Sequence, residues 1–341
     1  CAAGTLAAVT DESAEAVLFH IQMDDFRVAE AAWGPDGLVV LLHGVDKSPR
    51  ADQTSIALLR PDEREAALLV PPALGSGGPR YTIASALSSD GRRASPLIAD
   101  LESRLLLFDA EGKGGLLPGE VFPDTERWEN LAAGAKGRAI VFASGGVTRR
   151  IVATDTLGSA YRTLSTVSGP VRWLHFSPDG AWVFYAHEIG KLVVSLKAMT
   201  TDENTEGERT LIEGKIRLMD DSIFQDGSAV VAANLTNADS RLVLVNNAAE
   251  PTQTDLGQGS AIALAPDQES FACIADDYLG KPQVWLARLD APAERRQLTY
   301  LGEGVDSLCG VSPDGRWVFA SVGENSRPGV VFRRTDKTNE T

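Results

Sequence analysis

The chain has 341 residues, of which 43% are hydrophobic and 23% are charged, a composition that is ordinary for a folded protein and excludes wholesale disorder. Its formal net charge of −15 argues against nucleic acid as the main partner, because binding to phosphates requires a basic surface. No run of 18 apolar residues occurs, so the sequence predicts no transmembrane helix.

One short unit recurs along the chain and predicts its architecture. Each copy has an apolar segment, a turn related to Pro-Asp-Gly, a β-rich segment, a polar loop and a second β-rich segment. The turns end at residues 37, 91, 137, 180, 227, 268 and 315, which are 41 to 54 residues apart, as expected for propeller blades. Helical repeats of similar length are disfavoured, because the copies are rich in Val, Phe, Trp and Ile. The seven turns are Trp33–Gly37, Leu87–Gly91, Leu131–Gly137, Phe176–Gly180, Phe224–Gly227, Leu264–Gln268 and Val311–Gly315.

The residue types of this turn have a conformational reason. Proline fixes φ at the second position, aspartate tolerates the third, and glycine supplies the positive φ that ends the turn. The motif therefore predicts a tight hairpin between two strands. In the sixth copy Gln268 replaces the glycine, so this turn is expected to be looser or strained.

Each unit is predicted to contain four strands, here called A to D. In the sixth copy they are Ile262–Ala265, Glu269–Ile274, Gln283–Leu289 and a segment near residues 296–300. The turns then lie on one face of the molecule, the turn face. The B–C connections and the links between units lie on the opposite face, the loop face.

The last unit lacks its fourth strand, because Val330–Arg333 is followed only by a polar tail, residues 335–341. The segment Ala16–Gln22 belongs to no earlier unit, and we expect it to pair with the last unit and close the ring. The predicted fold is all-β: a seven-bladed β-propeller of four-stranded antiparallel blades, formed by residues 15–334. Residues 1–14 are expected to form an N-terminal tether.

The Ser-Pro-Asp-Gly turn and its aromatic-rich strand resemble the TolB-like propeller repeat, a WD-repeat-like family. Phe176–Leu196 and Leu264–Leu289 carry the resemblance best, and it covers residues 15 to 334. The resemblance implies a propeller that serves as a periplasmic interaction platform, or the propeller part of a prolyl-oligopeptidase-type peptidase. The chain departs from TolB itself in its predicted number of blades, seven against six, and in having no α/β domain before the propeller.

The sequence shows no catalytic or metal-binding constellation. His20, His43, His175 and His187 have no metal-ligand spacing, and no Gly-x-Ser-x-Gly motif occurs. We therefore expect no turnover, no metal and no cofactor. Two other readings stay open: an enzyme, a hydrolase or lyase, with its site in the central channel, and a sensor of a small ligand at the mouth of that channel.

The predicted B–C loops are acidic, and loops of varied length on a rigid scaffold are where recognition commonly resides. We therefore expect a protein partner with a basic patch to bind this loop face, the alternative being ordinary solvated loops of an acidic protein. The candidate binding residues are Asp100, Glu102, Glu188, Asp239, Asp276, Asp277 and Glu324.

Three cysteines complete the set of candidate residues. Cys1-Ala-Ala-Gly resembles the start of a processed bacterial lipoprotein, with lipid attached to Cys1; a sequence boundary that falls on a cysteine is the alternative. Cys273 and Cys309 lie in neighbouring units and are compatible with a disulfide, although their apolar flanks favour two buried free thiols. The sequence thus predicts a non-enzymatic scaffold of the bacterial cell envelope, periplasmic or at the cell surface, held at the membrane by lipid alone.

Overall fold

A computed structural model gives the fold of the chain. It describes all residues except 1–4, 11–15, 23–25, 35–36, 45–53, 61–64, 71–80, 88–92, 100–103, 110–113, 117–127, 134–138, 146–147, 156–160, 191–192, 202–206, 215–217, 237–238, 303, 323–328 and 336–341. The described elements are all β-strands. In this described part, no helix is long and apolar enough to cross a membrane.

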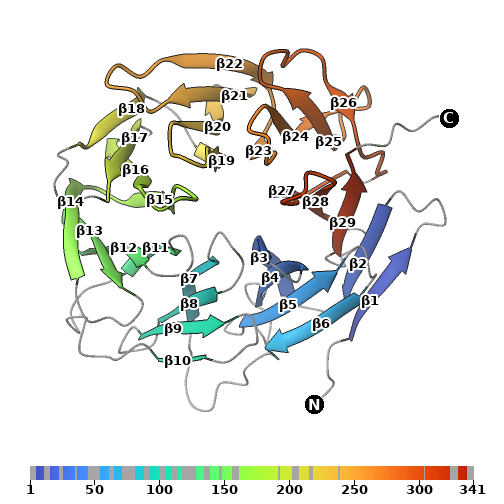
Figure 1. Cartoon of the computed structure of the whole chain (residues 1–341), viewed down its shortest axis with the longest axis horizontal. Coiled ribbons are helices and arrows are strands. Elements are labelled where there is room, and N and C mark those ends of the chain that lie inside the picture. The colour runs from blue at the N-terminus through green and yellow to red at the C-terminus, as the bar shows by residue number, and fades with distance from the viewer. Residues whose placement is uncertain are drawn as a thin grey trace.

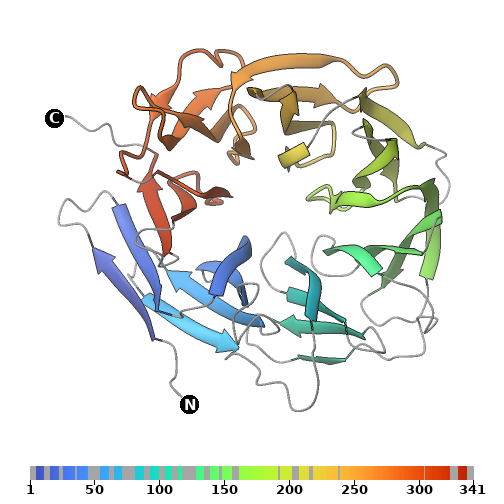
Figure 2. The same ribbon diagram turned by 180° about the vertical axis from the view of Figure 1, so that it is seen from behind.

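The described strands form seven antiparallel sheets, which Figure 1 shows arranged in a ring and Figure 2 shows from behind. Each sheet takes its strands from one unit of the repeat, with additions only in the last. The first three sheets are β3 (Phe26–Gly34), β4 (Gly37–Gly44), β5 (Thr54–Arg60) and β6 (Glu65–Val70); β7 (Tyr81–Leu87), β8 (Arg93–Ala99), β9 (Arg104–Asp109) and β10 (Gly114–Leu116); and β11 (Trp128–Ala133), β12 (Ala139–Gly145), β13 (Thr148–Asp155) and β14 (Tyr161–Ser168).

The next three sheets repeat this order. They are β15 (Val171–Phe176), β16 (Trp182–Gly190), β17 (Val193–Thr200) and β18 (Arg209–Gly214); β19 (Leu218–Ile223), β20 (Ala229–Thr236), β21 (Asp239–Asn246) and β22 (Gln253–Gln258); and β23 (Ala261–Leu264), β24 (Ser270–Asp276), β25 (Pro282–Arg288) and β26 (Arg296–Gln297). The strands of the sixth sheet agree within a few residues with those predicted from the sixth copy of the repeat.

The last sheet combines the two ends of the chain. Its order is β1 (Thr5–Thr10), β2 (Ala16–Gln22), β29 (Gly329–Arg334), β28 (Trp317–Val322) and β27 (Ser307–Val311). Strand β2 pairs antiparallel with β29 over Ala16–His20. The outermost strand β1 differs from the expected tether: the apolar segment TLAAVT pairs along β2, because a β-strand edge offers unpaired backbone groups to it.

The Ser-Pro-Asp-Gly turn is a self-contained hydrogen-bonded unit. The buried Ser177 hydroxyl donates to Asp179 Oδ1 at 2.5 Å and accepts the backbone N–H of Trp182 at 2.9 Å. Gly180 ends the turn with φ of +80°, as the motif predicted. Ser312, Asp314 and Trp317 repeat the arrangement in the last sheet. The serine, the aspartate and the glycine of the motif therefore each have a role in the turn.

An arginine at the start of the fourth strand connects a sheet to the next one at three places. Its guanidinium donates to the backbone carbonyl that follows the third strand of the next sheet. The pairs are Arg162 with Thr201 at 2.6 Å, Arg209 with Asn247 at 2.6 Å, and Arg296 with Thr335. The accepting residue in turn donates from its side chain to the glycine carbonyl of its own turn, in Thr201–Gly180, Asn247–Gly227 and Thr335–Gly315. These contacts join adjacent sheets at the turn face.

The hydrophobic core lies between neighbouring sheets, each of which packs one face on the next. Phe184 and Leu196 of the fourth sheet are fully buried in one cluster with Val230 and Val245 of the fifth. The fifth and sixth sheets share a second cluster, and the sixth and last share a third. This face-to-face packing leaves the strand ends and their connections to form the two faces of the molecule.

Candidate functional site

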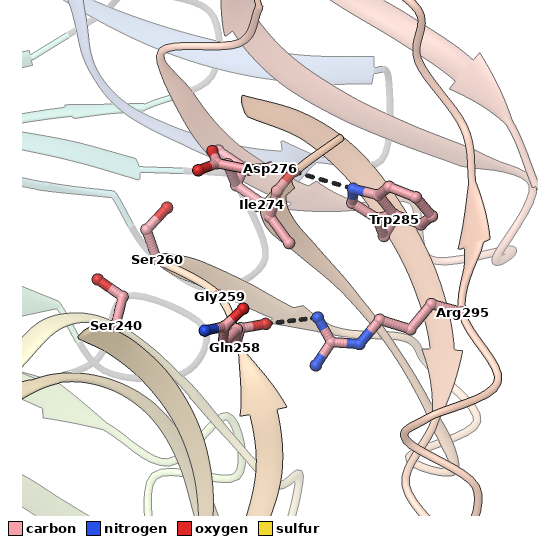
Figure 3. Close-up of a pocket in the computed structure, with 9 residues that line it drawn as sticks. Ser240, Gln258, Gly259, Ser260, Ile274, Asp276, Trp285 and Arg295 are labelled. Carbon is pink, nitrogen blue, oxygen red and sulfur yellow. Dashed lines mark hydrogen bonds between the residues drawn. The ribbon is translucent and has the colours of Figure 1, made fainter. Parts of the chain in front are cut away.

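A pocket of about 390 Å³ lies between the fifth and sixth sheets (Figure 3). It forms where the link from β22 to β23 meets the start of β21 and the end of β24, which is the loop-face end of both sheets. The pocket thus lies between two sheets, and not in the central channel where the sequence left room for an enzyme or sensor site. Its lining residues are Ser240, Gln258, Gly259, Ser260, Ile274, Ala275, Asp276, Trp285 and Arg295.

Arg295 forms one wall of this pocket and is held firmly in place. Its Nε donates to the Pro292 carbonyl at 3.0 Å, Nη2 to the Leu256 carbonyl at 2.6 Å, and Nη1 to the Gln258 carbonyl, the last contact being drawn in Figure 3. Gly257 permits this approach, because its φ is +93° and a Cβ there would lie 2.8 Å from Nη2.

Two further features fix the shape of the pocket. The Trp285 indole N–H donates to the Ala275 carbonyl at 2.9 Å, which fixes the plane of the ring in the wall. Gly259 lies in the lining, and a Cβ there would come within 2.8 Å of Leu242 and 3.1 Å of the Ile274 carbonyl. A side chain at residue 259 would therefore require Leu242 and the Ile274 carbonyl to shift.

A rigid turn of Asp277–Lys281 lies beside the pocket, between β24 and β25. The Asp277 carboxylate accepts the backbone N–H groups of Leu279 at 2.8 Å and of Lys281 at 2.9 Å. Tyr278 and Leu279 project from this turn and are 92% and 66% exposed. A well-ordered turn therefore holds two apolar side chains in solvent.

The structure assigns different surroundings to the predicted acidic residues. Asp276 is exposed and lines the pocket, whereas Asp277 organises the adjacent turn from within. Glu188 accepts a hydrogen bond from Arg172 Nε at 2.8 Å, an ion pair at the surface. Asp239 begins β21, but its side chain is outside the described residues, as are Asp100, Glu102 and Glu324.

The histidines form no metal centre in the described structure, where no group of three or more His, Cys, Asp and Glu side chains gathers. His187 is buried, with Nδ1 3.2 Å from the Ser168 carbonyl, and His175 contacts Trp173 in a tilted arrangement with ring centroids 4.9 Å apart. The side chains of His20 and His43 lie outside the described residues.

Cys273 is a free, fully buried thiol, the alternative that the sequence favoured over a disulfide with Cys309. Burial raises its pKa to about 11. Cys1 and the Cys309 side chain lie outside the described residues.

Comparison with known proteins gives structural neighbours only. No protein-family model matches the chain, and no curated protein matches it. An oligogalacturonate lyase in complex with manganese superposes with a TM-score of 0.65 at 13% identity, over 97% of this chain and 96% of that one. The fold is propeller-like.

Two other neighbours support the same conclusion. A chain of a mitotic checkpoint complex aligns with a TM-score of 0.57 at 13% identity, over 92% of both chains. The hydrazine synthase of Kuenenia stuttgartiensis aligns with a TM-score of 0.59 at 13% identity, over 91% of this chain and 96% of that one. All three are β-propeller proteins, and at this identity they share the fold alone with the present chain.

Proposed function

We propose that the chain is a non-enzymatic binding protein that recognises a protein partner through its loop face. The observation that carries this proposal is the distribution of exposed apolar side chains. Four large apolar residues are exposed in the described part of the chain: Ile189, Tyr278, Leu279 and Tyr300. Each lies in or beside a B–C turn or a link between sheets, and so on the loop face.

Tyr278 and Leu279 are the proposed anchors of the partner. Tyrosine is enriched among the residues that dominate interface energies, since it buries a large area at little entropic cost. The Asp277 carboxylate accepts hydrogen bonds from two backbone N–H groups, which hold the turn in place before any partner binds. The turn therefore loses little further conformational entropy on association. Asp276 adds a negative charge beside the anchors, which favours a partner with a basic patch.

We also infer that the seven sheets are the blades of a single propeller, closed by β2. The antiparallel order β2-β29-β28-β27 gives the last unit the fourth strand that its own sequence lacks. The cell-envelope location and the lipid on Cys1 stay predictions of the sequence.

The binding proposal is tested by photo-crosslinking in cells of the source organism. A crosslinking amino acid at position 278 should yield a discrete partner adduct, whereas the same group at Glu269, exposed on the turn face, should not. The identified partner, purified, should bind Tyr278→Ser at least tenfold more weakly than the wild type, and added salt should slow its association. Adducts of equal yield at both positions, or unchanged affinity of Tyr278→Ser, would rule out this face.

A further inference from the structure

The pocket between the fifth and sixth sheets contains one acidic and one basic side chain, contributed by different elements. Asp276 ends β24, and Arg295 precedes β26; Figure 3 shows them on separate walls, with Gln258 beside Arg295. Asp276 is exposed, so its carboxylate is accessible to a ligand. A pocket that offers both charges is complementary to a ligand that carries both.

Arg295 keeps hydrogen-bonding capacity toward such a ligand. A guanidinium has five N–H donors, and the bonds to the carbonyls of Pro292, Leu256 and Gln258 use one on each nitrogen. Nη1 and Nη2 therefore each retain a second N–H that can donate to a ligand carboxylate. Because the same three bonds hold the guanidinium in place, a ligand carboxylate would meet a preorganised donor.

The rest of the lining is suited to a small polar ligand. Ser240, Ser260 and Gln258 bring hydroxyl and amide groups, and the indole of Trp285 supplies an apolar wall. A volume of about 390 Å³ lies near the lower end of the range for small-molecule sites, roughly 300–1,000 Å³. Gly259 keeps side-chain atoms out of the lining at its own position.

We propose that this pocket binds a small zwitterion of the amino-acid or dipeptide class, with its ammonium group at Asp276 and its carboxylate at Arg295. A ligand with only a positive charge would be attracted by Asp276 but repelled by Arg295. A ligand with only a negative charge would be attracted by Arg295 but repelled by Asp276. The pocket shares only Asp276 with the proposed partner surface, since neither Tyr278 nor Leu279 lines it, and the proposal does not depend on the proposed function.

The first test uses the full chain and three forms of one ligand. Titration calorimetry should detect binding of Ala-Ala, and the N-acetylated and C-amidated forms, each lacking one charge, should bind at least tenfold more weakly. If either the N-acetylated or the C-amidated form binds as tightly as Ala-Ala, the pocket recognises only one charge and the zwitterion proposal is wrong. No binding of Ala-Ala at millimolar concentration would overturn it as well.

The second test assigns the charges to residues. Asp276→Asn should weaken Ala-Ala at least tenfold and should abolish the discrimination against the N-acetylated form. Arg295→Lys retains the positive charge but loses the planar guanidinium with its N–H donors. This variant should discriminate less against the C-amidated form. Glu294→Gln removes an exposed carboxylate next to Arg295 in the chain but outside the pocket, and should leave all three affinities unchanged. Equal discrimination in Asp276→Asn and the wild type would contradict the assignment.

Discussion

The side-chain oxygen of Gln268 accepts a hydrogen bond from the backbone N–H of Gln225 at 2.8 Å, which connects the turns of the sixth and fifth sheets. The carbonyl of Gln225 in turn accepts the backbone N–H of Asp179 in the turn of the fourth sheet, at 3.1 Å. Gln268 has φ of +56°, in the left-handed region that glycine occupies in the sister turns. The sixth turn, expected to be looser or strained, thus holds its glutamine in this left-handed conformation, and the amide of that glutamine bonds to the neighbouring sheet.

Two substitutions at Gln268 separate the strain from the amide contact. Gln268→Ala keeps the positive φ and loses the hydrogen bond, so it should lower the free energy of unfolding by about 1 kcal/mol. Gln268→Gly loses the same bond but relieves backbone strain of about 1 kcal/mol, so it should stay close to the wild type. Urea denaturation measures both. If the glycine variant is as unstable as the alanine variant, the left-handed backbone carries no appreciable strain.

The arginine contacts between sheets are expected to stabilise the fold measurably. Arg209 donates to the Asn247 carbonyl at 2.6 Å and lies 4.8 Å above the ring of Trp182. A charged hydrogen bond and a cation–π contact together predict a loss of about 2–3 kcal/mol for Arg209→Ala. Arg288→Ala is the matched control, because Arg288 is exposed and pairs with Asp290 at the surface, where a much smaller loss of stability is expected. Equal losses in the two variants would refute a special role for Arg209.

The buried thiol of Cys273 should be unreactive in the folded protein. Burial raises its pKa to about 11 from the ordinary 9.0, so the reactive thiolate is scarce at pH 8. Iodoacetamide followed by peptide mapping should label Cys273 only after denaturation. Labelling of the native protein at Cys273 would contradict the burial described here.

The same pKa shift makes stability depend on alkaline pH. Between about pH 9 and pH 11 the folded protein keeps a proton on Cys273 that the unfolded chain loses, so the free energy of unfolding should fall as the pH rises through this window. Other groups titrate here too, so the measurement is the difference in slope between the wild type and Cys273→Ala. A shallower slope is expected in the variant, and identical slopes would exclude the linkage.

The repeat made the strands and turns predictable, because each Pro-Asp-Gly-like turn marks a hairpin by local chemistry alone. The arginine contacts also left a signal, since Arg162, Arg209 and Arg296 each begin the pattern Arg-Thr-Leu or Arg-Gln-Leu. The Asp-Tyr-Leu-Gly pattern at residues 277–280 likewise indicates a turn whose aspartate binds its own backbone, so Asp277 was less suited to a partner than Asp276.

The pocket had no comparable signal in the sequence. Ser240, Gln258, Asp276 and Arg295 come from separate strands and links, and they meet only through the packing of two sheets. The close approach of Gly259 to Leu242 and to the Ile274 carbonyl likewise becomes evident only when the two sheets are packed together. The local residue pattern predicts strands and turns, whereas a site of this kind depends on how the strands pack in three dimensions.

The proposed closure of the ring by β2 predicts that the two ends of the chain stabilise each other. Removing residues 1–24 deletes β1 and β2 and leaves the β29 edge without the partner that now pairs with it over Gly329–Arg333. Because an unclosed ring frays from its open seam, this truncation should lower the melting temperature of the whole protein in a single transition. Amide exchange at Val330–Phe332 should accelerate with it. Removing residues 1–10 alone deletes β1, which pairs only with β2 in the sheet order, and should have a much smaller effect. If both truncations melt like the full chain, β2 does not close the ring, and the paired ends contribute nothing to its stability.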